Sequence, residues 1–232
     1  MTTMTVSNAT IRSAVRDDAI AIADVLTTAF LYGDLATWLI PHPDTRARVY
    51  RPYFALLTEQ ALDHGQIDIT YDPDVGVTAV ALWYPIADRP VPAPDGYQTR
   101  LAQITGEYLH RFTALDQATH RHHPYTDWHH YLGHLAVRPD FQRRGLGGGL
   151  LRHHHRELDR TGTAAYLEAT GSDNSRLYAQ FGYQPCATYH VTPAGPALFP
   201  MWRPARLATP QRHKAGRSEA TTPFAQQPSR PT

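Results

Sequence analysis

Hydrophobic and polar positions follow two different periods along this chain. A period of two is typical of a half-buried strand, and apolar residues three or four positions apart are typical of an amphipathic helix. On this basis we predict strands at residues 11–15, 67–71, 75–84, 128–137, 164–169 and 186–191. We predict helices at residues 20–30, 34–40, 44–64, 147–160 and 174–181, and a partly helical stretch at 97–123.

Residues that break regular structure mark several of the boundaries. Asp72-Pro73-Asp74 predicts a turn between two strands, and the proline-containing stretch 85–96 predicts a loop. Asp17 and Asp18 precede the first helix, where a carboxylate can accept free backbone N–H groups. Gly65 follows the helix at 44–64 and predicts its end.

The composition excludes several classes of protein. With 232 residues, 42% of them hydrophobic and 10% aromatic, the chain has enough apolar material for a core and is not wholly disordered. It has no run of 18 apolar residues, which excludes a transmembrane helix. A single cysteine, Cys186, excludes an internal disulfide framework and a cysteine-based zinc site. Residues 1–9 lack the pattern of a signal peptide, so we expect a cytoplasmic protein without a membrane partner.

The charge is unevenly distributed. The net charge of +1 is too small to indicate a nucleic-acid partner. Residues 205–232 carry five basic side chains and one acid, Glu219, so the rest of the chain is mildly acidic. This tail is also rich in proline and polar residues. We predict that it is disordered, because it cannot bury enough apolar surface to offset its conformational entropy.

The segment 131–151 carries the strongest chemical signal. An apolar strand ends at Arg138-Pro139-Asp140, and a helix follows whose start is rich in glycine. The glycines concerned are Gly145, Gly147, Gly148 and Gly149. Backbone N–H groups at such a helix start can converge on an anion, and Arg143 and Arg144 add positive charge. Each glycine costs a helix roughly 1 kcal/mol against alanine, which favours a functional phosphate site over a helix start that binds nothing.

The spacing of these glycines fits neither of two common nucleotide-binding motifs. No Gly-Lys-Ser/Thr follows, so the loop is not a Walker loop. The third spaced glycine of a dinucleotide fingerprint is also missing.

Three segments together resemble the GCN5-related N-acetyltransferases, the GNAT family. Gln142-Arg-Arg-Gly145-Leu-Gly147 matches the family's Gln/Arg-x-x-Gly-x-Gly/Ala loop. Ala165-Tyr-Leu-Glu-Ala-Thr170 and the segment Asn174-Ser-Arg-Leu-Tyr178-Ala-Gln-Phe-Gly182-Tyr183 resemble its fifth strand and the following helix. The resemblance covers about residues 11–191. Trp128 before the strand, together with the loop and the Leu-Glu-x-Thr strand, looks most like the branch that contains puromycin N-acetyltransferase.

The resemblance implies a fold and a cofactor. The fold is α/β: one domain over residues 1–204, with a mixed, mostly antiparallel, twisted sheet and helices on both faces. The cofactor is acetyl-CoA, held in a splay between the strand that starts at Trp128 and the strand that starts at Ala164. The residues expected to hold it are Leu135, Ala136, Val137, Gln142, Arg143, Arg144, Gly145, Leu146, Gly147, Gly148, Asn174 and Tyr178.

The reaction that the resemblance implies is attack of a neutral amine on a thioester, which needs a base and an acid. Tyr178 matches the position that protonates or stabilises the leaving thiolate, although it could also simply pack on its helix. Asn174 either binds the pantetheine arm or caps its helix. Glu168 and His134 are both candidates for the base. Regular alternation would place His134 on the strand face of Leu132 and Ala136, and leaves open which face lines the site.

The early helices form the acceptor pocket in this family. Phe30, Tyr32, Asp34 and Trp38 are therefore candidate wall residues, with Phe30 and Asp34 as the expected substrate contacts. An aspartate beside aromatic rings suits a cationic amine. Plain core packing is the alternative for Phe30 and the preferred interpretation of Trp38.

The predicted function is direct transfer of acetyl from acetyl-CoA to an amine of a small molecule, without an acyl-enzyme. Cys186 lies outside the motifs and is not expected to act as a nucleophile. The alternatives are a non-catalytic acyl-CoA-binding sensor and a protein N-acetyltransferase. The resemblance also suggests detoxification of an antibiotic, and the chain is expected to be a monomer or a homodimer.

Fourteen histidines raise the question of a metal site. His153, His154 and His155 are consecutive on a predicted helix, where neighbouring side chains point about 100° apart and cannot all bind one ion. No acidic or cysteine partner has ligand spacing near the other histidines, at 120–130. We therefore predict no metal, and a solvated polar face for both groups.

Overall fold

The computed structural model describes residues 9–206, so all of the predicted tail beyond residue 206 lies outside the described residues. These residues form one eight-stranded sheet in the order β1-β2-β3-β4-β5-β8-β6, with β7 paired to β8. The strands are β1 (Thr10–Ser13), β2 (Gln66–Asp72), β3 (Gly76–Ile86), β4 (His129–Val137), β5 (Ala164–Ala169), β6 (Gln184–Pro185), β7 (Tyr189–His190) and β8 (Ala197–Arg203).

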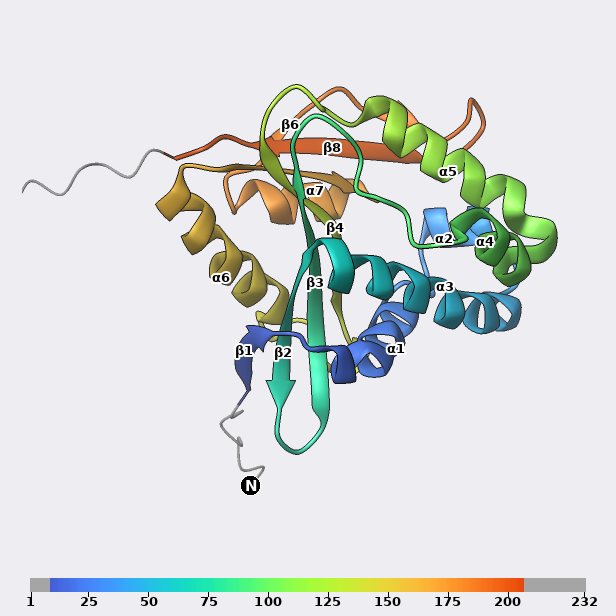
Figure 1. The fold of residues 1–232 in the computed structure, drawn as a ribbon, viewed down its shortest axis with the longest axis horizontal. Coiled ribbons are helices and arrows are strands. Elements are labelled where there is room, and N and C mark those ends of the chain that lie inside the picture. The colour runs from blue at the N-terminus through green and yellow to red at the C-terminus, as the bar shows by residue number, and fades with distance from the viewer. Residues whose placement is uncertain (1–8, 207–232) are drawn as a thin grey trace, which may run out of the picture.

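The sheet is mixed and strongly twisted, as predicted. Only the β4–β5 pair is parallel among the described strands, and the other neighbours are antiparallel. In Figure 1 β3 stands nearly upright while β8 lies nearly level, which reflects the accumulated twist between neighbouring strands. The helices are α1 (Ala19–Ala29), α2 (Asp34–Leu39), α3 (Pro43–His64), α4 (Tyr97–Thr105), α5 (Leu109–His122), α6 (Leu146–Thr161) and α7 (Ser172–Ala179).

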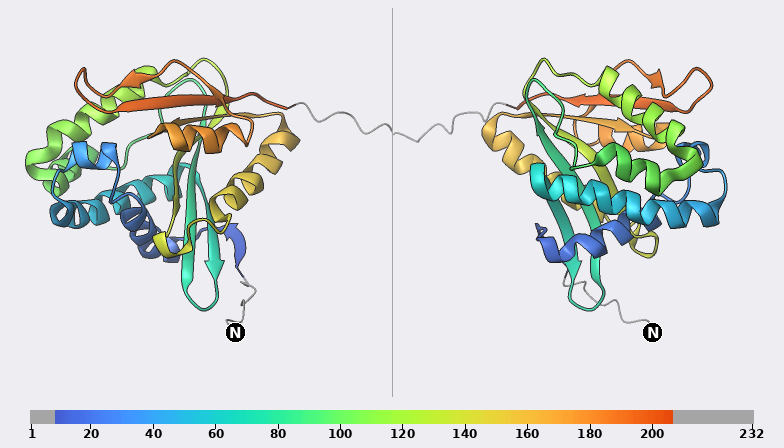
Figure 2. Two further views of the ribbon diagram at one scale, coloured as in Figure 1. Left: turned by 180° about the vertical axis from the view of Figure 1, so that it is seen from behind. Right: turned by 45° about the vertical axis from the view of Figure 1, so that its right-hand side comes forward.

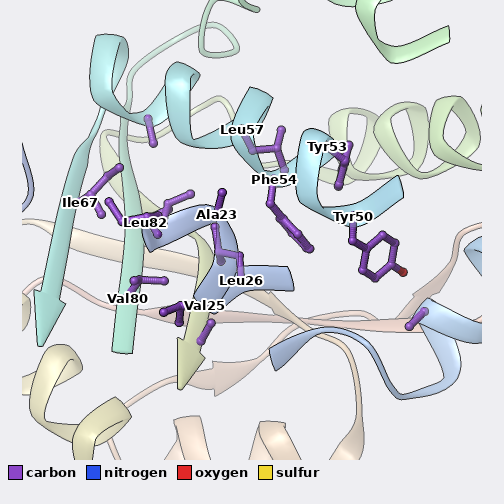
Figure 3. Packing of buried hydrophobic residues seen from close by; sticks show 14 of the residues in the cluster. Ala23, Val25, Leu26, Tyr50, Tyr53, Phe54, Leu57, Ile67, Val80 and Leu82 are labelled. Atoms are coloured by element: carbon purple, nitrogen blue, oxygen red, sulfur yellow. The ribbon is translucent and has the colours of Figure 1, made fainter. Parts of the chain in front are cut away.

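Helices cover both faces of the sheet. α1 and α3 pack on one face of β2 and β3, and α6 packs on the other, so the strands separate them in both views of Figure 2. Figure 3 shows the first of these layers, where Leu26 of α1 and Phe54 of α3 pack near Val80 and Leu82 of β3. The alternation along β3 explains this, because Trp83, next to Leu82, faces α6 instead.

Buried polar groups hold the first layer in place. Arg46 of α3 is only 2% exposed, and its guanidinium donates to the backbone carbonyls of Leu31, Ile40 and Pro41. These carbonyls flank α2, so one side chain links the two ends of this short helix and satisfies the buried carbonyl of Ile40. Asp18 accepts the N–H of Val15 at 2.8 Å and pairs with Arg12, so it stabilises the turn before α1 and does not cap α1 itself.

A β-bulge interrupts β4. The register pairs Leu82 with His134 and Trp83 with Leu132, which leaves Gly133 as the extra residue. A Cβ atom at Gly133 would lie 2.9 Å from the ring of Tyr84, so the bulge needs glycine. The predicted regular alternation therefore fails at Gly133. Leu132 packs in the α6 layer, whereas His134 packs on the opposite face against Phe30, which follows α1, and Phe54 of α3. Ala136 shares the face of His134, as predicted.

The C-terminal part of the sheet also differs from the prediction. The single strand predicted at 186–191 is two short strands, β6 and β7, and the longer strand β8 was not predicted at all. Pro196 and Pro200 make this segment look like a loop. Pro200 is accommodated in β8 opposite Glu168, and the predicted helical stretch at 97–123 is divided at Gly106 into α4 and α5. No helix in residues 9–206 is both long enough and apolar enough to span a membrane.

Candidate active site

One cavity of about 850 Å³ runs along the sheet. At one end it reaches the start of α6, where Gln142 and Gly147 line it. It continues past Leu135 of β4 and Glu168 of β5, and at the other end it reaches Asp116 of α5. The cavity thus connects the glycine-rich segment with the space between the helices on the α1 and α3 side.

The start of α6 offers free backbone donors to this cavity. Gly145 precedes the helix with a φ of 80°, in the left-handed region that glycine adopts most readily, and the N–H of Gly149 donates to its carbonyl at 2.9 Å. The amides of Leu146, Gly147 and Gly148 come before that first helical bond and have no acceptor within the helix. Together with the helix dipole they form a site suited to a phosphate group.

Close packing explains one of the glycines. A Cβ atom at Gly148 would lie 2.9 Å from Phe181 Cζ, whereas one at Gly147 would lie at an ordinary contact distance of 3.5 Å from Val137 Cγ2. The absence of a side chain at Gly148 therefore lets the helix start lie directly against Phe181, and Gly147 has room for a methyl group beside the end of β4. Gly149 faces Ile11 and lies outside the cavity lining.

The polar residues of the loop stabilise its backbone through hydrogen bonds. Gln142 donates to the carbonyl of Val137 at 3.3 Å, and Arg144 donates to the carbonyl of Asp140 at 2.8 Å. The guanidinium of Arg144 also lies 4.7 Å from the centre of the Phe141 ring. Arg143 is exposed and has a positive φ of 59°. Both arginines belong to the loop before α6 but are not among the residues that line the cavity, and Arg144 has a structural role. Their contact with a phosphate remains a prediction.

The splay between β4 and β5 begins at the bulge. The two strands pair only at His129–Ala164, His130–Ala165 and Tyr131–Tyr166. From Leu132 to Val137 the edge of β4 that faces β5 has no ladder partner among the described strands. Backbone groups of Leu135, Ala136 and Val137 lie along this open edge, and Leu135 and Val137 line the cavity. Such an edge can pair with an extended chain as an added strand would.

The short helix α7 brings Asn174 and Tyr178 to the cavity wall. Asn174 is the third residue of the helix, and its amide lies 3.5 Å from the hydroxyl of Thr170. It does not occupy the cap position, which is Gly171. Tyr178 is half-buried against Tyr183, and burial raises the pKa of its hydroxyl to about 12. The phenol therefore stays protonated at neutral pH and can act as a donor.

Glu168 has an environment that the sequence did not reveal. One carboxyl oxygen, Oε1, accepts the hydroxyls of Tyr166 at 3.1 Å and of Tyr189 at 3.2 Å. The other, Oε2, is buried without a hydrogen-bond partner among the described residues. Burial raises the pKa of this carboxyl to about 7, although hydrogen bonds from Tyr131, Tyr166 and Tyr189 act in the opposite direction. A carboxylate with that pKa can take up and release a proton near neutral pH.

His134 lies in the same cavity but in a more apolar setting. Its ring contacts Phe30 and Phe54 edge to face, at 5.7 and 5.8 Å between centres. Its Nδ1 is buried without a partner in the described part of the chain. Burial lowers the pKa of His134 to about 4, so the ring is neutral at pH 7 and is a weaker base than Glu168.

The far part of the cavity contains the predicted acceptor residues and several that were not predicted. Phe30, Tyr32 and Asp34 line it, whereas Trp38 lies outside and packs against Arg111. The wall also includes unpredicted aromatic side chains and one acid. These are Tyr50, Tyr53, Phe54, Tyr97, Tyr131 and Asp116. No motif marks them, since they come from α3, α4, α5 and β4 and meet only in the folded protein.

The predicted solvated face is wrong for several of the histidines, although His120 and His122 are exposed. His154 is 2% exposed, stacks on Trp83 with 4.0 Å between ring centres, and lies 2.9 Å from Asp68 Oδ2. His129 is fully buried and contacts His123 at 3.0 Å. They are buried because aromatic neighbours and buried hydrogen-bond partners replace water. Within the described residues no group of histidine, cysteine or acidic side chains has the geometry to hold a metal ion.

Comparison with known proteins shows similarity to acetyltransferases in sequence and fold. Residues 110–185 match the family model described as the acetyltransferase (GNAT) domain. A solved structure from Corynebacterium glutamicum, described as histone acetyltransferase HPA2 and related acetyltransferase, is similar with a TM-score of 0.68 and 29% identity. That similarity covers 87% of this chain and 98% of the other.

Two further solved structures share the fold at lower identity. The ribosomal-protein-S18-alanine N-acetyltransferase from Escherichia coli is 18% identical, with a TM-score of 0.53, over 88% of this chain and 97% of the other. A polyamine N-acetyltransferase from Drosophila melanogaster is 15% identical, with a TM-score of 0.54, over 84% and 99%. The family match over residues 110–185 and the shared fold support an acetyltransferase (GNAT) domain in this chain.

Proposed function

We propose that this protein transfers an acetyl group from acetyl-CoA to the amine of a small cationic molecule by direct attack. The observation that carries the proposal is the continuous cavity, which joins the free amides of α6 to the unpartnered oxygen of Glu168. Among the described residues that line it there are three acids and no arginine or lysine. An acceptor cavity of this kind favours cations and disfavours anions.

The residues present fit acetyl-CoA, which supplies an acetyl thioester when it is bound. The amides of Leu146, Gly147 and Gly148 are placed to hold its pyrophosphate, and the open edge of β4 to hold its pantetheine arm. Gln142 keeps the loop in register with β4 through its bond to Val137. Asn174, exposed on the opposite wall, is the side chain available to a polar group of the arm.

Glu168 is the base in this proposal. A protonated amine must lose a proton before it can attack, and the free Oε2 of Glu168 is the acceptor that the cavity offers. Its pKa of about 7 leaves a large fraction ionised at neutral pH. Tyr166 and Tyr189 position the carboxyl through Oε1. His134 remains neutral and forms part of the apolar wall, which excludes water from the reacting end.

Tyr178 is the proposed acid. It lines the cavity opposite the open edge of β4, and its hydroxyl holds its proton at neutral pH. It can therefore donate a hydrogen bond where negative charge develops on a departing sulfur. Cys186 is exposed and lies outside the cavity lining, which supports direct transfer without an acyl-enzyme.

A thiol-release assay with acetyl-CoA tests the proposal. The panel contains arylalkylamines, aliphatic amines, aminonucleosides, amino acids and an amino-terminal peptide. We expect release of CoA that depends on a cationic amine and is weak with amino acids, whose carboxylate meets an acidic cavity. Acetyl label retained on the denatured protein would contradict direct transfer. Tight CoA binding by calorimetry without release on any amine would support the sensor alternative, and release with the peptide alone would support a protein acceptor.

A further inference from the structure

We propose that the acceptor carries a second positive charge, distant from the amine that is acetylated, and that Asp116 at the far end of the cavity binds it. The inference rests on the proposed function, because it takes the Glu168 end as the reacting end. It adds a second binding site and narrows the acceptor class to diamines and related dications with an apolar or aromatic body.

Asp116 is a half-buried carboxylate that lines the cavity from α5. Its Oδ2 accepts the hydroxyl of Tyr97 at 2.7 Å, and burial raises the pKa of the carboxyl. No arginine, lysine or histidine pairs with it in the described part of the chain. The nearby Glu59 is different, since Arg100 of α4 holds its carboxylate with two hydrogen bonds. Asp116 is thus left without a counter-charge in a place that a ligand can reach.

A wall of aromatic rings separates Asp116 from the reacting end. The ring of His134 contacts Phe54 at 5.8 Å between centres, and Phe54 contacts Tyr53 at 5.3 Å. The charge of Asp116 is close enough to Tyr53 to help raise the pKa of its hydroxyl. An apolar chain or an aromatic ring fits along this wall, and a cation is stabilised beside such rings. The geometry therefore suits a molecule with charge at both ends and apolar atoms between them.

The second, independent observation is at the other end. Glu168 Oε2 is buried, has no partner among the described residues, and belongs to a carboxyl that lines the same cavity. A buried acceptor without a partner is costly, which indicates a ligand donor at this position. Of the three acids that line the cavity, Glu168 at the reacting end and Asp116 at the far end match two cationic groups on one acceptor.

Kinetics with matched amines test the inference. The probes are α,ω-diaminoalkanes and 1-aminoalkanes of equal chain length, assayed at saturating acetyl-CoA with the full chain. For the wild-type protein we expect kcat/KM to be roughly tenfold higher for the best diamine than for its monoamine. Asp116→Asn should bring this ratio close to one, mainly through a higher KM for the diamine, and should leave kcat/KM for the monoamine nearly unchanged.

Two further variants control for general effects of a substitution on folding or on the structure of the cavity. Tyr97→Phe removes only the hydroxyl and leaves the charge of Asp116, so the preference for the diamine should persist. Glu107→Gln removes an exposed charge between α4 and α5 that lies outside the cavity lining, and it should change neither substrate.

The outcomes separate this inference from the proposed function. A diamine preference that survives in Asp116→Asn, or a wild-type ratio close to one, would overturn the second site while acetyl transfer stands. If neither amine series gave acceptor-dependent release of CoA, the proposed function would fail first, and the inference would fail with it.

Discussion

The two functional parts of the cavity, the donor end and the acceptor end, use different chemical groups of the chain: backbone groups in one and side chains in the other. The donor end consists of backbone groups of one continuous segment, from the open edge of β4 to the amides of Leu146, Gly147 and Gly148. The acceptor end consists of side chains from α2, α3, α4, α5, β4 and β5. Backbone recognition needs glycine at fixed neighbouring positions, which leaves a mark in the sequence. Recognition by side chains needs only that residues from distant parts of the chain come together in the fold. The side chains of the acceptor end can therefore be exchanged without changing the backbone groups of the donor end.

The largest expected effect is at the acceptor end. Glu168→Gln keeps the shape and the tyrosine contacts but removes the base, so turnover should fall by roughly 10²- to 10⁴-fold. Affinity for CoA, measured by calorimetry, should stay nearly constant, because the donor end is separate. Glu157→Gln, an exposed change on α6, is the matched control and should leave turnover unchanged. Turnover near the wild-type level in Glu168→Gln would remove Glu168 from the reaction.

The pH profile distinguishes the two candidate bases. With Glu168 as the base, kcat/KM should fall as the pH drops below about 7, since the carboxyl becomes protonated. With His134 as the base, the fall in kcat/KM would instead occur near pH 4. A rate that is flat from pH 8 to pH 5 would therefore favour His134.

Tyr178 lies between the two ends, and its effect should be intermediate. Tyr178→Phe removes one hydroxyl that is available to the leaving group, so kcat should fall by roughly 10²-fold while CoA affinity changes little. Steady-state kinetics and calorimetry on the same preparation check this. A loss of CoA affinity as large as the loss of kcat would instead indicate that Tyr178 mainly packs against the bound arm.

The comparison also explains what the sequence could predict. The loop from Gln142 to Gly147 and the Asn174–Tyr178 segment are local in sequence, and the four residues named here line the cavity. The Asp116–Tyr97 pair joins residues from α5 and α4, and it exists only once those helices pack. β8 was hidden by its prolines, and the side of the sheet that His134 faces depends on a bulge at Gly133 that local alternation does not reveal.

Stability should depend on the Glu168 carboxyl in a pH-dependent way. Its pKa is about 7 in the folded protein and about 4.3 when unfolded, so its contribution is favourable at acid pH and is lost as the pH rises through 7. Glu168→Gln should therefore raise the free energy of unfolding by up to about 3 kcal/mol at pH 8.5, and by less than about 1 kcal/mol at pH 5. Urea unfolding of both proteins checks this, and an equal gain at both pH values would contradict the raised pKa. The buried histidines are present in both the wild-type protein and Glu168→Gln, so their pH-dependent contributions cancel in the difference between the two free energies of unfolding.

The smallest effects separate the glycines of the donor end. Gly147→Val places methyl groups between the amides and Val137, and should raise KM for acetyl-CoA by about tenfold with little change in kcat. Gly149→Ala faces Ile11 at ordinary contact distance and lies outside the cavity, so it should add up to about 1 kcal/mol to stability and leave KM unchanged. Equal KM values for acetyl-CoA in the two variants would show that binding at the start of α6 does not depend on glycine at position 147.

The bulge at Gly133 makes β4 sensitive to its length in an unusual way. Strict alternation along these residues would place positions 130, 132, 134 and 136 on one face. With the bulge, His130 reaches His154 in the α6 layer, while His134 reaches the cavity. Loss of the Gly133 codon would remove the extra residue and leave every later side chain on its present face, whereas loss of a codon after the bulge would move the remaining side chains of the strand to the opposite face. An evolving gene can therefore shorten this strand at Gly133 without exchanging its two faces, but at no position beyond it.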